Sequence, residues 1–170
     1  MSQYLVLTAI GADRTGCVSE LTKLASKCGC NIMDSRMAIF GQEFTLIMLL
    51  EGDARAINQI EAKIPKVAVE LELITMMKRT SDYCSIDSNQ HYNAEYAGID
   101  QPGILKSVTA FFANRNIDIS SLKSDIDKQT KQMKANIQFT VNNAANIEDI
   151  ESDFLQLCEQ IDIQGCITKQ

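Results

Sequence analysis

Apolar and polar residues in the first half of the chain follow the periods of strand and helix in turn. An apolar run from Tyr4 to Ile10 predicts a strand. The next segment, Gly16 to Cys28, carries apolar residues at helical spacing and predicts an amphipathic helix, which Gly29 is placed to end. Two further strands are expected at about Asn31 to Phe40 and at Phe44 to Leu50, joined by a two-residue hairpin turn.

The remainder of this half predicts a second helix and a fourth strand. Asp53 can cap a helix that carries apolar residues at helical spacing up to Ile64. Pro65 is expected to end this helix, because proline lacks the backbone N–H. Apolar and polar residues then alternate from Val67 to Leu73, which is typical of a strand with one buried face. The predicted order is therefore β-α-β-β-α-β.

The second half of the chain repeats the first. The string GADRTG at residues 11–16 recurs as GIDQPG at residues 98–103, an offset of 87 residues. The same offset relates Ile32 to Ile119 beyond the following helix, so we interpret the chain as a duplication. The second half is expected to contain a strand at Tyr92 to Ala97, a helix lined by Ile104 to Phe112, strands at Ile117 to Ile126 and Met133 to Val141, a helix capped by Asn146, and a strand at Asp162 to Thr168.

This element order predicts an α+β fold of two tandem ferredoxin-like βαββαβ units, each an antiparallel sheet with both helices on one face. Right-handed crossovers give the strand order 4-1-3-2. Strands 2 and 4 are then edge strands that can pair with another unit, so the predicted fold allows a homo-oligomer. The expected domains are residues 1–75 and 92–170. Residues 76–91, which show no clear period and include the single histidine, His91, are interpreted as a linker.

Composition and charge exclude several classes of function. The formal net charge is −6, and the first 80 residues carry nine basic and nine acidic groups, so the excess is confined to the second half. Phosphate binding needs clustered Lys and Arg, and no such cluster exists, so direct nucleic-acid binding is not expected. The chain lacks an apolar run of membrane-spanning length and a signal-peptide pattern at its start. We therefore expect a cytoplasmic protein without membrane contact.

Reactive side chains are few and scattered. The six cysteines include one C-x-C pair, Cys28 and Cys30, and there is one histidine. Zinc sites usually show two closely spaced pairs, so no metal and no cofactor are expected, and the thiols are interpreted as buried and reduced. His91 has no Ser or Cys nucleophile motif around it, so the chain is not expected to be an enzyme.

The methionines allow two interpretations. They could form an adaptable binding surface, or they could fill the core, which is their more frequent use and the favoured prediction. The residues concerned are Met33, Met37, Met48, Met76, Met77 and Met133.

The Gly-x-Asp loop, the helix after it and the strings CGCNI and NRNIDI resemble the ACT domain family of small-molecule sensors. The resemblance covers nearly the whole chain as two copies. It implies that an amino acid binds where the first loop of one unit meets the second strand of a neighbour. The positions in this chain that match are Gly11, Asp13, Arg14, Gly16 and Asn31 in the first unit, and Gly98, Asp100, Gly103 and Asp118 in the second.

The chemistry of these positions suits a free amino acid. Helix N–H groups can bind a carboxylate, Asp13 can accept from an ammonium group, and Asn31 can donate or accept. Asp118 stands where the first unit has Asn31, and an ionised Asp cannot donate. The second unit could therefore bind differently or not at all.

The strings of the first half, among them GQEFTLIMLLEG and MMKRT, resemble transcription regulators within this family. This resemblance implies that the chain represses the glycine cleavage operon by binding its LysR-type activator, with glycine as the expected effector. An alternative is a regulatory subunit that senses an amino acid for a biosynthetic enzyme. A third possibility, a catalyst on a ferredoxin-like fold, lacks a constellation of acid and base residues.

Overall fold

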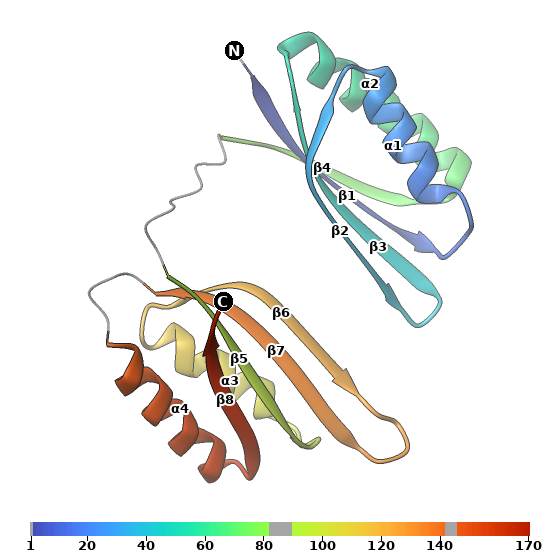
Figure 1. Ribbon diagram of the computed structural model, residues 1–170. Helices are drawn as coiled ribbons and strands as arrows, with labels where there is room; N and C mark the ends of the chain where they lie inside the picture. Colours follow the sequence, from blue (N-terminus) through green and yellow to red (C-terminus); the bar gives the residue numbers. More distant parts are fainter. Residues whose placement is uncertain (1, 82–89, 142–145) are drawn as a thin grey trace. The chain divides into compact units, whose positions relative to one another are not determined.

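The computed structural model describes residues 2–81, 90–141 and 146–170. The chain divides into two compact units, Met1–Cys84 and Ser85–Gln170, hereafter unit 1 and unit 2. Each unit is a four-stranded antiparallel sheet with two helices packed on one face (Figure 1). The predicted α+β fold of two tandem ferredoxin-like units is therefore confirmed.

Unit 1 has the predicted strand order, β2-β3-β1-β4. The hairpin between β2 and β3 pairs Phe40 with Glu43 across a turn in which Gly41 has φ 66°, as a glycine-first two-residue turn requires. Asp53 caps α2 as predicted, because its carboxylate accepts from the Ala56 N–H at 2.7 Å. The elements are β1 (Gln3–Ala12), α1 (Cys17–Lys27), β2 (Asn31–Phe40), β3 (Glu43–Gly52), α2 (Ala54–Leu71) and β4 (Ile74–Thr80).

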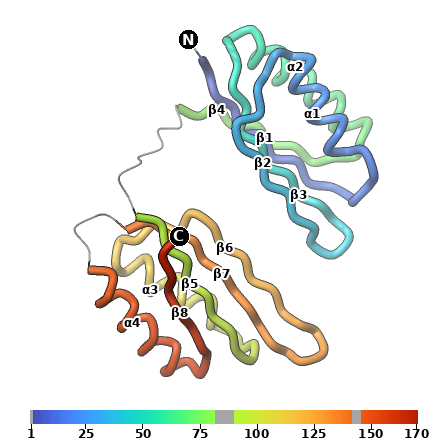
Figure 2. Tube along the Cα trace, in the orientation of Figure 1, coloured from blue at the N-terminus to red at the C-terminus, as the bar shows by residue number. Residues whose placement is uncertain are grey.

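Unit 2 repeats this plan with the order β6-β7-β5-β8 (Figure 2). Asn146 caps α4 as predicted by accepting from the Glu148 N–H. The duplication preserves an irregularity as well: the bulge after Ile32 in β2 recurs after Ile119 in β6, at the same offset of 87 residues. The elements are β5 (Gln90–Ile99), α3 (Ile104–Ala113), β6 (Asp118–Ile126), β7 (Gln132–Val141), α4 (Ile147–Gln160) and β8 (Ile163–Lys169).

The predicted end of the second helix and the predicted fourth strand were wrong. Pro65 lies inside α2, which continues to Leu71, and the strand follows at Ile74–Thr80. Proline costs the helix one hydrogen bond, but the buried side chains of Ile64 and Ala68 on either side of it hold the helix on the core. The helix ends at Glu72, which has φ 55° and whose N–H donates to the Val69 carbonyl.

The predicted linker was too long at both ends. Residues 76–80 belong to β4, and His91 lies in β5 opposite Thr140 rather than in a connection. Arg79 fixes β4 to α2, because its guanidinium donates to both carboxylate oxygens of Glu61, at 2.9 and 2.6 Å. These two hydrogen bonds lower the pKa of Glu61. Residues 82–89 of the predicted linker lie outside the described residues.

The two cores differ in chemistry. Unit 1 buries mostly aliphatic side chains, whereas unit 2 packs Phe112 against Phe111, Phe139 and Phe154 with ring centroids 4.8–6.0 Å apart. Among the residues the structure describes, no helix is long and apolar enough to span a membrane.

The sulfur-containing side chains follow the predictions only in part. Cys17, Cys28, Cys30 and Cys158 are buried free thiols, but Cys166 is exposed, which corrects the expectation for that residue. Burial raises the pKa of Cys158 to about 11. Met48 and Met133 fill the cores, whereas Met33, Met37 and Met76 are 50, 48 and 66% exposed, so the prediction of core methionines was wrong for these three.

Candidate functional site

The loop between β1 and α1 leaves the first turn of the helix open. Gly16 is the N-cap of α1 with φ 99°, and no side chain caps this end of the helix. A Cβ added at Gly16 would meet no atom within 4 Å, so the space above the backbone is open. The first N–H groups of a helix lack partners within the helix, so this terminus offers donors to an anion.

Unit 2 reproduces this geometry. Gly103 caps α3 with φ 100°, again without a side-chain cap and with open space above it. A residue with a side chain is strained at such an angle, so both positions require glycine. Open, positively polarised helix ends therefore occur at the same place in both units.

Gly11 and Gly98 have a structural explanation instead. A Cβ at Gly11 would lie 2.6 Å from Cδ2 of Leu73 and 3.1 Å from the Glu72 carbonyl oxygen. A Cβ at Gly98 would lie 2.8 Å from Cγ2 of Ile163. The missing side chain lets the first strand pass close to the residues before β4 in unit 1 and to the start of β8 in unit 2. The packing accounts for these two glycines without a ligand.

Asp13 and Asp100 begin the two loops in the same way. The Asp13 N–H donates to the Gln42 carbonyl at 3.0 Å, and the Asp100 N–H donates to the Lys131 carbonyl at 2.8 Å, so each loop is anchored to the neighbouring hairpin. Within the described residues, neither carboxylate has a hydrogen bond or ion pair. Both remain available to a cation.

The side chain of Arg14 is held by contacts within unit 1. Its guanidinium donates to the Leu71 carbonyl and forms an ion pair with Glu72 at 3.0 Å. A cation at the last carbonyl groups of α2 complements the negative end of the helix. Arg14 therefore joins the candidate loop to the end of α2, and unit 2 has Gln101 at this position.

Asn31 and Asp118 lie at the other end of their sheets. Asn31 is aligned through Glu51 with Tyr4, seven residues before Gly11 along β1. Seven strand residues span about 23 Å. Asp118 is aligned in the same way with His91, seven residues before Gly98. Within a unit, the structure does not bring these residues to the glycine loop.

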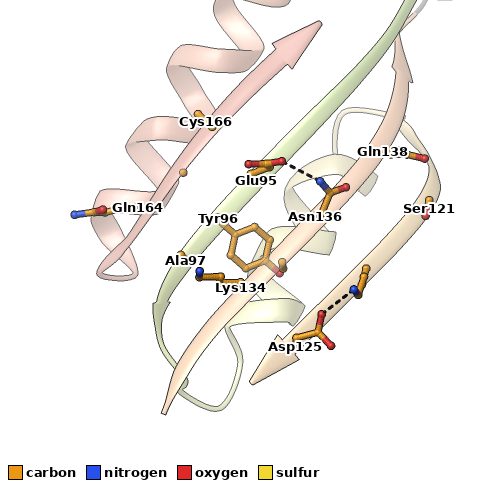
Figure 3. Close-up of a pocket in the computed structure, with 13 residues that line it drawn as sticks. Glu95, Tyr96, Ala97, Ser121, Asp125, Lys134, Asn136, Gln138, Gln164 and Cys166 are labelled. Carbon is orange, nitrogen blue, oxygen red and sulfur yellow. Dashed lines mark hydrogen bonds and ion pairs between the residues drawn. The ribbon is translucent and has the colours of Figure 1, made fainter. Parts of the chain in front are cut away.

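Sequence reasoning missed the sheet faces that point away from the helices. In unit 2 this face carries a hollow of about 800 Å³ (Figure 3). Its lining includes paired polar side chains: Glu95 accepts from the Asn136 amide at 3.1 Å, and Lys123 lies 3.3 Å from Asp125. In unit 1 the corresponding face holds a hollow of about 340 Å³ lined by Val6, Asp34, Arg36, Ile47, Leu49, Thr80 and Ser81. The alternation within each strand could have identified these residues once the buried face was known.

Asp118 lines a further hollow, of about 550 Å³, between the start of β6 and α4. Asp149 and Asp153 lie in the same lining, and Arg115 donates to Asp153 at 2.7 Å. Arg115 therefore already neutralises one of these carboxylates. The described residues contain no cluster of three or more His, Cys, Asp or Glu side chains that could hold a metal ion.

Comparisons with known proteins agree with this architecture. A family model described as an ACT domain matches residues 3–78. A glycine cleavage system transcriptional repressor from Escherichia coli (strain K12) is 38% identical over 168 residues, which cover 96% of this chain and 88% of that protein.

Solved structures show the same two-unit architecture. A crystal structure assigned as a glycine cleavage system transcriptional repressor has 35% sequence identity and a TM-score of 0.78, covering 100% of this chain and 98% of that chain. A protein of unknown function from Galdieria sulphuraria has a TM-score of 0.79 at 19% identity, covering 100% of this chain and 99% of that one, which shows the shared fold alone.

Proposed function

Because this chain belongs to the ACT-domain family of glycine cleavage system transcriptional repressors, we propose that it senses a free amino acid and represses transcription through another protein. Glycine is the proposed effector, and a LysR-type activator of the glycine cleavage operon is the proposed partner. The observation that carries the ligand proposal is the open left-handed backbone at Gly16, three residues after Asp13, whose carboxylate has no partner among the residues that the structure describes.

The proposed binding mode follows from the charges of the ligand. The carboxylate of the amino acid would accept from the N–H groups at the start of α1, and its ammonium group would donate to Asp13. Asn31 would complete the site from the second strand of a neighbouring unit, because the Asn31 of the same unit lies about 23 Å away along the sheet. Arg14 would position the loop through its contacts with α2.

We propose a weaker site at the glycine loop of unit 2, formed by Gly103 and Asp100 together with Asp118 from the second strand of a neighbouring unit. The helix end is as open as that of unit 1, but an ionised Asp118 can only accept hydrogen bonds. It would therefore bind an ammonium group and would repel a carboxylate. Gly11 and Gly98 would serve both sites indirectly, by allowing the close packing of strands that shapes each loop.

We propose that the chain represses transcription without binding DNA itself. The excess of acidic over basic groups opposes phosphate contacts. The similar protein from Escherichia coli is named a transcriptional repressor, which supports a role without catalysis. Ligand binding would then change the affinity for the activator, and the activator must change the affinity for the ligand by the same factor.

Calorimetric titration with all twenty amino acids tests the sensing step. We expect glycine or another small amino acid to bind, and Asp13→Asn to weaken the binding because the ammonium group loses a charged acceptor. Glu43→Gln is the matched control, since Glu43 is an exposed carboxylate opposite Ala12 in the adjacent strand. Absence of binding to every amino acid at millimolar concentration would refute the sensor proposal.

A gel-shift experiment on the operon control region tests the proposed partner. The protein is added alone and then together with the LysR-type activator, in each case with and without glycine. We expect an effect only when the activator is present, and we expect glycine to change it. Specific retardation of the DNA by this protein alone would refute a mechanism without DNA contact.

A further inference from the structure

The sheet of unit 1 exposes apolar side chains on the face opposite its helices. This surface, hereafter the open face of unit 1, includes Ile47 in the central strand β3, which is 46% exposed. Ile74 and Met76 in the edge strand β4 are 76 and 66% exposed. Monomeric proteins rarely leave contiguous apolar surface of this kind uncovered, so such a patch marks an interaction site. Its apolar members are Val6, Ile10, Ile47, Leu49, Ile74 and Met76.

Unit 2 shows that the fold does not require these residues. At the places of Ile47 and Leu49 in the sheet, unit 2 carries Asn136 and Gln138. At the place of Met76, unit 2 carries Cys166. The same backbone is thus stable with a polar open face, as the hollow in Figure 3 illustrates. The apolar face of unit 1 therefore serves something other than the folding of the unit.

One row of residues on this face carries opposite charges at its two edges, and Arg36, in the next row of the same face, lies 3.6 Å from Asp34. Lys78 in the edge strand β4 pairs with Val6, Val6 pairs with Leu49, and Leu49 pairs with Asp34 in the edge strand β2. Residues paired across antiparallel strands point to the same side of the sheet. The row therefore runs from a cation, across two apolar side chains, to an anion.

We propose that the open face of unit 1 packs against the same face of a second copy of the chain. A two-fold axis parallel to the strands places β4 of one copy over β2 of the other. Lys78 then faces Asp34 of the second copy, and Val6 faces Leu49, so this row is complementary to itself. An axis across the strands would instead place β4 over β4 and would lose these charge pairs.

The dimensions of the face are sufficient for a modest dimer. Strands of ten residues are about 33 Å long, and four strands span about 19 Å. Two such faces would bury roughly 1,200 Å², which is the lower end of the range for specific interfaces. A dimer through this face would require neither a bound amino acid nor the activator.

Sedimentation equilibrium of the full chain tests the proposal. We expect a reversible dimer whose dissociation constant rises at least about tenfold in Ile47→Arg, because each copy would bury an unpaired charge. Asn136→Arg makes the same change at the same place in the sheet of unit 2, and it should leave the dimer unchanged. A monomer at every concentration, or a dimer that Asn136→Arg breaks and Ile47→Arg does not, would overturn the proposal.

Exchanging the charges of Asp34 and Lys78 tests the direction of the two-fold axis. Asp34→Lys and Lys78→Asp should each weaken the dimer by placing like charges together, and the double variant should restore it. Both residues are exposed, but Asp34→Lys also removes the ion pair between Asp34 and Arg36 within the unit, so circular dichroism checks that each variant is folded. Failure of the double variant to recover would refute the axis parallel to the strands.

Discussion

Unit 2 places Phe112 where unit 1 places Ala25, and both side chains are completely buried. On the other side of the sheet, unit 2 places Asn136 where unit 1 places Ile47. The left-handed glycines, the strand order and the bulge are nevertheless the same in both units. The comparison teaches that backbone-determining residues fix the unit, while the core and the open face can change independently.

The largest expected effect is a loss of stability that is confined to the core of one unit. Phe112→Ala removes the centre of the aromatic cluster in unit 2 and should lower the free energy of unfolding of that unit by about 3–5 kcal/mol. Hydrogen exchange followed by residue should show the loss of protection in unit 2. Leu21→Ala is the comparison variant, since it truncates a completely buried side chain in the core of unit 1. Equal loss of protection in both units with Phe112→Ala would contradict separate cores.

The two candidate ligand sites should respond unequally. Asn31→Ala should weaken amino-acid binding by about 1.5–3 kcal/mol, or roughly ten- to a hundredfold, because a hydrogen bond to a charged ligand group is lost. Asp118→Ala should change the overall affinity less, since unit 2 is proposed as the weaker site. Calorimetry measures both variants, and Asn136→Ala, at a half-buried strand Asn outside the proposed ligand sites, is the control. A larger effect of Asp118→Ala would reverse the proposed ranking.

Glycine at the end of the first strand should matter more in unit 2 than in unit 1. Gly98→Ala brings a Cβ to 3.3 Å from Cα of Ile163 as well as against its side chain, and it should destabilise unit 2 by about 1–3 kcal/mol. Gly11→Ala should cost less, because the closest atom is the flexible end of Leu73. Denaturant titration of both variants measures the difference. A larger cost for Gly11→Ala would show that the Glu72 carbonyl, not the side chain, limits the packing.

The smallest expected effect is a change in melting temperature on removing the ion pair between Arg79 in β4 and Glu61 in α2. The hydrogen bonds from Arg79 lower the pKa of Glu61, so this stabilisation is present above the ordinary pKa of a glutamate and is lost as the pH falls through the lowered value. Arg79→Gln should therefore reduce the melting temperature slightly near pH 7, and the difference from the unmodified chain should disappear in acid. Lys169→Gln, at the matching place in β8, is the control. A difference that persists in acid would contradict this origin.

The amino-acid sequence by itself determined the duplication, the order of the elements and the order of the strands. The two loops at residues 11–16 and 98–103 require left-handed glycines at fixed places, and such local requirements are visible in sequence. The handedness of the crossovers then leaves one strand order. The caps at Asp53 and Asn146 could be predicted for the same reason, since an N-cap depends only on its neighbours.

Only the tertiary structure decided where α2 ends and what the loop residues contact. The segment after Pro65 has apolar spacing that fits a strand or a helix, and the burial of Ile64 and Ala68 against the sheet selects the helix. Arg14 meets the end of α2 across 57 residues of sequence, a contact that no local pattern encodes. The sheet face opposite the helices is apolar in unit 1 and carries polar residues in unit 2, and strand register determines which residues lie on it. Alternation shows which residues share a face, but packing against the helices decides which face is left exposed.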